Sequence, residues 1–251
     1  MSISKIKENA RAGLAGKWGK GACIVLAYLG FFFVIGIVVG LLGEESVIGS
    51  IIDLASTIIQ VPLILGVSYA FIKLKRNEEV KAFDFLSLGF SNFGRAWKIG
   101  LREILKLILP FIVMIIGAIL FTFGTVSVVI SGTGSTGLVL IGGITYLVSI
   151  IWFAVRSLLY SLTAFVAYDN PNMNSLEVVN ESARMMKGNR GKLFLLLLSF
   201  IGWAILAVLT LGIGYLWLMP YMMVTEVCFY EYLLGKKAEN NTENVEPITE
   251  M

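Results

Sequence analysis

The chain has 251 residues, of which 57% are hydrophobic and only 15% are charged, and it contains no histidine. So much apolar surface does not fit inside a water-soluble core of this size, so the composition excludes an ordinary soluble domain and predicts a protein that crosses a membrane several times. The net charge is +3, but the cations flank apolar segments, where anionic lipid headgroups attract them, so no nucleic acid is expected as a partner.

Six apolar stretches are each near or above the roughly 20 residues that a helix needs to cross the hydrocarbon core. In chain order they are residues 21–42, 47–74, 104–130, 138–168, 193–210 and 215–234. The last two could form one broken helix, but about 42 residues at ~1.5 Å each would be twice the thickness of the bilayer, so a turn is expected at 211–214. The fourth stretch is longer than one crossing requires, so either its last turns leave the membrane or its helix tilts.

The positive charges lie on one side of this predicted topology. The connections 43–46, 131–137 and 211–214 contain no Lys or Arg, whereas nineteen of the twenty cationic residues lie near the other ends of the apolar stretches. Arg156, inside a stretch, is the exception. The positive-inside rule therefore predicts that the basic segments and both termini face the cytoplasm.

Before each pair of apolar stretches, apolar residues recur every three or four positions, which is the spacing of one helix face. They are Ile3, Ile6, Ala10 and Leu14; Phe83, Leu86, Phe90, Phe93 and Trp97; and Leu176, Val179, Ala183 and Met186. Cations occupy the other faces, as expected for helices that lie in the headgroup layer, although basic amphipathic loops are common in membrane proteins. The predicted fold is an all-α membrane protein with six transmembrane helices as three hairpins, each preceded by a cytoplasmic amphipathic interfacial helix.

The polar and acidic residues 238–251 have almost nothing to bury, so they are expected to form a disordered cytoplasmic tail after a single membrane domain of residues 1–237. Within the second and sixth stretches, Pro62 and Pro220 each free a carbonyl one turn earlier and are expected to bend the helix. Gly36 and Gly40 form a small-xxx-small face, which favours close helix approach within the protein or between subunits.

Four charged residues lie inside the apolar stretches: Asp53, Arg156, Glu226 and Glu231. An unpaired charge at mid-depth costs roughly 3 kcal/mol or more, so these residues are the candidate intramembrane polar site. Counting residues places Asp53 near the outer surface, Glu226 near the middle, and Arg156 and Glu231 at a similar depth toward the cytoplasm. An ion pair between Arg156 and Glu231 is predicted, with Glu226 as a second partner. It would be a structural latch, a proton or ion relay, or a site for a lipid headgroup.

No catalytic, cofactor-binding or metal-binding constellation is recognised in the sequence. It has no histidine, its two cysteines lie in apolar stretches, and the glycine-containing loop 131–137 lacks the lysine of a phosphate-binding loop. A non-enzymatic role is therefore expected.

Several motifs, most of them in the last third of the chain, resemble a known family. They are Glu181-Ser182-Ala183-Arg184-Met185-Met186-Lys187-Gly188-Asn189, Leu198-Ser199-Phe200-Ile201-Gly202-Trp203, Thr210-Leu211-Gly212-Ile213-Gly214, Leu216-Trp217-Leu218-Met219-Pro220-Tyr221, Phe229-Tyr230, Arg76-Asn77-Glu78, Phe83-Asp84-Phe85-Leu86 and Gly89-Phe90. This pattern resembles the bacterial integral membrane proteins grouped as the domain-of-unknown-function 975 family. The resemblance implies a multi-pass protein of the bacterial cytoplasmic membrane, and it brings no agreed activity, substrate or catalytic residue.

The leading functional hypothesis is a protein that organises anionic lipid, or docks a membrane partner, through its cytoplasmic amphipathic helices. A protein partner or a homo-oligomer remains open. The alternative is a small transporter or lipid-translocating protein that uses Arg156, Glu226 and Glu231 in a cavity at the membrane midplane. An enzyme that acts on membrane lipid is third, because neither histidine nor a cluster of exposed acids is present.

Overall fold

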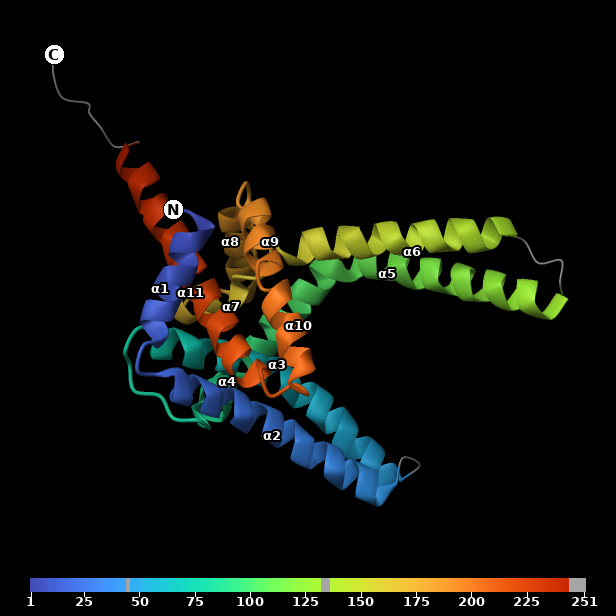
Figure 1. The fold of residues 1–251 in the computed structure, drawn as a ribbon, viewed down its shortest axis with the longest axis horizontal. Helices are drawn as coiled ribbons and strands as arrows, with labels where there is room; N and C mark the ends of the chain where they lie inside the picture. Colours follow the sequence, from blue (N-terminus) through green and yellow to red (C-terminus); the bar gives the residue numbers. More distant parts are fainter. Residues whose placement is uncertain (44–45, 132–135, 244–251) are drawn as a thin grey trace, which may run out of the picture. The chain divides into compact units, whose positions relative to one another are not determined.

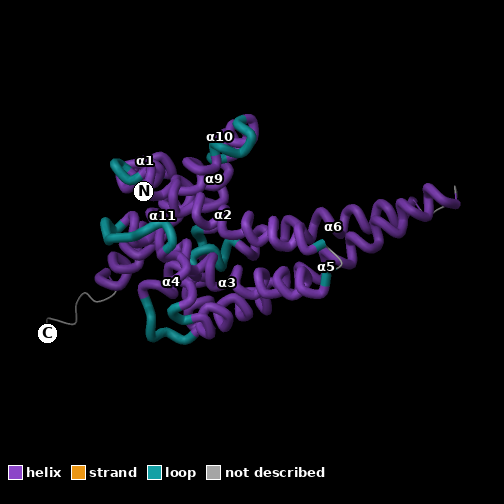
Figure 2. The backbone as a smooth tube through the Cα atoms, turned by 90° about the horizontal axis from the view of Figure 1, so that it is seen from below, coloured by secondary structure: helices purple, strands orange, loops and turns teal. Residues whose placement is uncertain are grey.

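The computed structural model describes residues 1–43, 46–131 and 136–243, and in these ranges it contains helices and turns without strands (Figures 1 and 2). The helices are α1 (Ile3–Leu14), α2 (Trp18–Leu42), α3 (Val47–Lys75), α4 (Asp84–Phe90), α5 (Phe93–Ser131), α6 (Thr136–Ser157), α7 (Thr163–Asp169), α8 (Ser175–Met186), α9 (Arg190–Leu198), α10 (Ile201–Leu209) and α11 (Tyr215–Glu243). Five helical stretches of the described chain are long and apolar enough to cross a membrane: Trp18–Leu42, Val47–Lys75, Phe93–Ile130, Thr136–Ser157 and Arg190–Leu209. The protein is therefore an all-α membrane protein.

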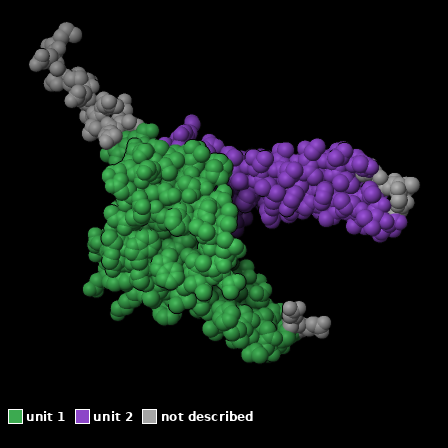
Figure 3. Space-filling model, viewed as in Figure 1, with its two compact units in different colours: residues 1–97, 164–172, 191–251 green, residues 98–163, 173–190 purple. Residues whose placement is uncertain are grey.

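The chain divides into two compact units (Figure 3). The first contains residues 1–97, 164–172 and 191–251, and the second contains residues 98–163 and 173–190. The first unit therefore holds the α2–α3 hairpin with α1, α4, α7 and α9 to α11, and the second holds α6, α8 and most of α5.

Several helix boundaries differ from the expected spans. Helix α5 begins at Phe93, so the end of the second amphipathic segment and the third expected span form one continuous helix. The earlier part of that segment forms α4, a separate helix of seven residues. The stretch 138–168 is interrupted after Ser157, and the stretch 193–210 is interrupted at Ser199 and Phe200. Helix α11 continues to Glu243, into the segment expected to be disordered, and residues 244–251 lie outside the described ranges. Most of the loop 131–137 is likewise not described.

In the first unit, α1 is held by its apolar face. Ile6, Ala10 and Leu14 are completely buried, and α1 packs against α11 and α3. Ser2 caps its N-terminus by accepting a hydrogen bond from the backbone N–H of Lys5. Because these apolar side chains are already covered by protein, the cations of α1 project from a fixed helix.

Glycine lets α3 and α4 touch backbone to backbone. A Cβ added at Gly66 would overlap the carbonyl oxygen of Phe85 and would lie 2.8 Å from the backbone nitrogen of Gly89. One turn earlier in α3, Pro62 provides no N–H for the carbonyl of Ile58, and the indole N–H of Trp97 donates to that oxygen at 3.1 Å. In contrast, nothing described lies within 4 Å of an added Cβ at Gly36 or Gly40, so a contact between subunits through that face stays a prediction.

In the second unit, α5 and α6 form a hairpin that is also packed through glycine. A Cβ at Gly117 would lie 2.6 Å from the backbone nitrogen of Tyr146, and one at Gly142 would overlap the backbone nitrogen of Phe121. Helix α8 contacts the segment after α6 through the hydroxyl of Ser182, which donates to the carbonyl of Leu159 at 2.9 Å.

The helices α1 and α8 have the same length and the same ends. Each has 12 residues, and each begins after an extended residue, Ser2 or Asn174, whose side chain accepts a backbone N–H. After each helix a turn places a glycine, Gly16 or Gly188, at positive φ, and the backbone N–H of the next residue closes the turn. Helix α4 does not share this geometry, so the local similarity holds for the first and third segments.

Candidate functional site

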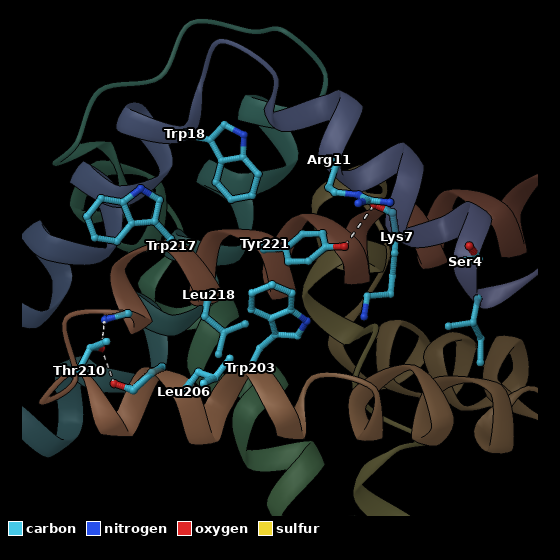
Figure 4. Close-up of a pocket in the computed structure, with 13 residues that line it drawn as sticks. Ser4, Lys7, Arg11, Trp18, Trp203, Leu206, Thr210, Trp217, Leu218 and Tyr221 are labelled. Atoms are coloured by element: carbon cyan, nitrogen blue, oxygen red, sulfur yellow. Dashed lines mark hydrogen bonds between the residues drawn. The ribbon is translucent and has the colours of Figure 1, made fainter.

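A cavity of about 750 Å³ in the first unit lies against α1, the start of α2, α10 and α11 (Figure 4). This volume is within the range typical of ligand pockets. Figure 4 shows Lys7 at one end of the cavity and Leu206, Thr210 and Trp217 at the other. One end is therefore cationic, and the other is mostly apolar.

Lys7 is positioned by contacts from two other helical segments. Its Nζ donates to the Ser199 hydroxyl at 3.0 Å, at the break between α9 and α10, and lies 4.3 Å from the centre of the Phe200 ring. The hydroxyl of Tyr221 in α11 donates to the backbone carbonyl of Lys7 at 3.5 Å. These contacts hold the ammonium group beside the aromatic wall of the cavity.

The described residues that line the cavity include Lys7 and Arg11 but no Asp or Glu. Within the described ranges, no carboxylate forms a salt bridge with Lys7 or Arg11, although Lys5 on the same helix pairs with Glu8 at 3.0 Å. Partial burial, and then the nearby charge of Arg11, lower the pKa of Lys7 from its ordinary value of 10.5. Two cations beside an apolar wall form an environment that an anionic, amphipathic ligand would complement.

The rest of the wall is rich in aromatic side chains. The rings of Trp18 and Tyr221 lie 6.0 Å apart, and Trp203 and Trp217 line the cavity from α10 and α11. These two tryptophans are 58% and 51% exposed, so protein covers only part of each ring. Tryptophan is favoured where an apolar environment meets a polar one, as in the headgroup layer of a membrane.

A second polar cluster in the first unit joins the ends of α3 and α7 to α11. The guanidinium of Arg76 binds both carboxylate oxygens of Asp169, at 2.6 and 2.9 Å, and the hydroxyl of Tyr230 donates to the same carboxylate at 3.0 Å. Glu231 forms salt bridges with Lys75 and, at 3.7 Å, with Arg76. Hydrogen bonding to Asp169 raises the pKa of Arg76, so this side chain stays charged at any accessible pH. Every charge named here has an opposite charge beside it, so the cluster links the ends of α3 and α7 to α11.

The four candidate residues lie in different surroundings. Glu231 is in the second polar cluster, with Lys75 and Arg76 as its partners. Glu226 is partly buried in α11, and Asp53 is exposed in α3. Arg156 belongs to the second unit, where its Nε atom is buried without a hydrogen-bond partner in the described chain. The ion pair between Arg156 and Glu231 therefore stays a prediction.

The aromatic cavity was not predicted from the sequence. The three-four spacing predicted a cationic helix at Lys7 and Arg11, but it does not indicate which cations lack an acidic neighbour. That depends on contacts such as the one between Lys7 and Ser199, which are 192 positions apart. Asp169 was also missed, because it lies one residue beyond a predicted span. The described residues contain no group of three or more Cys, Asp or Glu side chains that could hold a metal ion.

Comparison with known proteins identifies a family but no function. The profile of a family described as "Protein of unknown function (DUF975)" matches residues 1–237. No curated protein and no solved structure matches the chain.

Proposed function

Because the chain belongs to the DUF975 family, whose function is unknown, we propose a role from its own geometry: a non-enzymatic membrane protein that binds and organises anionic lipid. The binding site would be the cavity between α1, α10 and α11, on the cytoplasmic side of the membrane. The observation that carries this proposal is the pair formed by Lys7 and Arg11, which have no carboxylate partner among the described residues and lie beside a wall of tryptophan side chains.

Three features support a lipid as the ligand. A phosphate group would be an anionic partner for Lys7 and Arg11, and an acyl chain would cover the exposed faces of Trp203 and Trp217. The cations are held in place, because the apolar face of α1 is buried in protein. A ligand that binds here therefore does not have to pay the conformational entropy of ordering that helix.

The double variant Lys7→Gln/Arg11→Gln is expected to lose about 2 kcal/mol of affinity for phosphatidylglycerol, or roughly 30-fold, since each cation near a membrane surface contributes about 1 kcal/mol. Lipid adducts can be counted by native mass spectrometry after delipidation and titration with phosphatidylglycerol or phosphatidylcholine. The matched control is Lys5→Gln/Lys20→Gln, which removes the same charge from neighbouring positions that do not line the cavity. An equal loss in both double variants would mean that the cavity is not the site.

Binding of anionic lipid is also expected to weaken as the pH rises. This loss should occur at a lower pH than it would if Lys7 had the pKa of an ordinary lysine. The pKa of Lys7 is lowered in the free protein, so this side chain is cationic below that pKa and neutral above it. Affinity for phosphatidylglycerol should then fall as pH rises through the lowered pKa of Lys7, below the ordinary value of 10.5, and a Lys7→Arg variant should resist the fall because guanidinium stays protonated. A pH profile that is the same for both proteins would contradict this assignment.

A further inference from the structure

The contacts at the start of α2 place it beside the end of α3 and beside Pro220 of α11, and this common height is called the entry level. Lys17 donates to the carbonyl of Leu74 at 2.8 Å, near the end of α3, and Gly21 is so close to Pro220 of α11 that an added Cβ would lie 2.9 Å from the proline Cβ. This level carries Lys17, Lys20, Lys73 and Lys75, as expected where helices enter a membrane from its basic side.

From this level the hairpins extend to different depths. Helix α2 continues from Gly21 to Leu42, about 32 Å at ~1.5 Å per residue, which matches the roughly 30 Å of a hydrocarbon core. In the same direction from this level, α11 has only residues 215–219, which precede Pro220. Helix α10 has nine residues, or about 14 Å. In Figure 1 the turn between α10 and α11 ends short of the far ends of α2 and α3. The α10–α11 hairpin therefore reaches only about half the membrane thickness.

The turn of this hairpin is apolar. Leu209, Leu211 and Ile213 are 73%, 94% and 61% exposed, and no charged residue lies between Lys192 and Glu226. The other two predicted turns contain glutamate or Ser and Thr. A turn that ended in water would expose these large apolar side chains to solvent at a cost in free energy, whereas hydrocarbon would cover them.

The backbone N–H groups of the turn all have acceptors within the hairpin. Thr210 contributes twice, because its hydroxyl donates to the carbonyl of Ala207 at 2.7 Å and accepts the N–H of Gly214 at 2.8 Å. The other N–H groups of the turn, at residues 210–213 and 215–218, donate to carbonyls of the same hairpin. Backbone N–H groups in hydrocarbon must find their acceptors internally, and those of this turn do so.

We propose that α10 and α11 form a re-entrant hairpin, which enters the bilayer from the basic side and turns back near the middle of the hydrocarbon core. The chain then crosses the membrane with α2, α3, α5 and α6. The cavity beside α1 would span one leaflet, with Lys7 at the headgroups and Trp217 among the acyl chains. This topology does not depend on which ligand binds in that cavity.

The alternative joins α9 and α10 into one crossing of 20 residues, with the turn 211–214 in water on the opposite side. In that arrangement the break at Ser199, where Lys7 binds, would lie at mid-depth, and the polar face of α1 would lie in hydrocarbon. Lys192 in α9 instead donates to the carbonyl of Met1 and to the hydroxyl of Tyr232. Tyr232 lies more than two helical turns beyond Pro220 in α11, in the direction away from the loop 211–214. These contacts place α9 on the basic side of the entry level.

Cysteine accessibility tests the proposal. In a Cys23→Ala/Cys228→Ala background, the variants Leu211→Cys and Ile213→Cys probe the turn, Ser46→Cys probes the α2–α3 turn, and Lys20→Cys probes the basic side. A membrane-impermeant maleimide is applied to right-side-out and to inverted vesicles, and labelling is quantified by mass spectrometry. Thermal unfolding of each variant in detergent confirms that it is folded.

The expected result is that Ser46→Cys reacts from one side, Lys20→Cys reacts from the other, and both turn variants react roughly tenfold or more slowly from either side. A thiol in hydrocarbon forms little thiolate, and an impermeant reagent does not reach it. Labelling of Leu211→Cys and Ile213→Cys from the side that labels Ser46→Cys would overturn the proposal, and so would rapid labelling from the basic side. The rate of labelling does not depend on lipid charge, so the re-entrant topology and the lipid-binding proposal can be rejected independently of each other.

Discussion

Replacing Gly66 by alanine is expected to destabilise the protein by about 3 kcal/mol, the upper part of the range for overpacked sites. The new Cβ would overlap the carbonyl oxygen of Phe85 in α4, and backbone atoms cannot move aside as a flexible side chain can. Helices α3 and α4 would have to separate, and the contacts along their crossing would be lost. The midpoint of thermal unfolding in a fixed detergent, followed by tryptophan fluorescence, measures the change.

The matched control for this variant is Gly36→Ala. Gly36 is also inside an apolar helix, but no described atom lies within 4 Å of its added Cβ. Alanine has a higher helix propensity than glycine, so this change should leave stability unchanged or raise it by up to about 1 kcal/mol. Equal destabilisation by both variants would show that the loss of stability at Gly66 does not come from the close contact between α3 and α4.

Asp169→Ala is expected to cost about 2 kcal/mol of folding free energy. The carboxylate of Asp169 binds the guanidinium of Arg76 through two hydrogen bonds and accepts a third from Tyr230. The two side chains of the ion pair are 29% and 21% exposed, so its worth falls between that of an exposed pair, at most about 1 kcal/mol, and that of a buried pair, about 3 to 5 kcal/mol. Removing the aspartate leaves Arg76 with the more distant Glu231, at 3.7 Å.

The control for the ion pair is Glu8→Ala, which breaks the pair between Lys5 and Glu8. Those side chains are more than half exposed, so the loss should be at most a few tenths of a kcal/mol. Urea titration of both variants in the same detergent gives the comparison. If Asp169→Ala were as mild as Glu8→Ala, the cluster would not stabilise the packing of α7 against α3 and α11.

The sequence predicted the first two apolar helices almost to the residue, because each is bounded by lysines or a polar turn. Helices α2 and α3 end within a few residues of the expected limits. The start of α5 was missed because the amphipathic segment that contains Phe93 and Trp97 continues into the span as one helix, and periodicity alone does not show whether two helical segments are joined. The break at Ser199 was also missed, since periodicity does not reveal where a lysine from another helix will bind.

The candidate site shows the same limit. Rare charges inside apolar stretches drew attention to Glu231, but its partners Lys75 and Arg76 are set by the crossing of α3 and α11. Lys7 and Arg11 were predicted only as part of a cationic helix face. Their value as a binding pair depends on which carboxylates the tertiary fold brings near, and spacing along the chain carries no such information.

The hydrogen bond between Trp97 and the carbonyl of Ile58 bears on the order in which the chain is assembled. These residues are 39 positions apart, and Trp97 follows the whole of α3 and α4. While the chain is being synthesised, α3 reaches the membrane before Trp97 does, so the carbonyl freed by Pro62 at first has no indole partner. Completion of the first hairpin therefore waits for the first residues of α5, which couples the maturation of α3 to the arrival of the next helix.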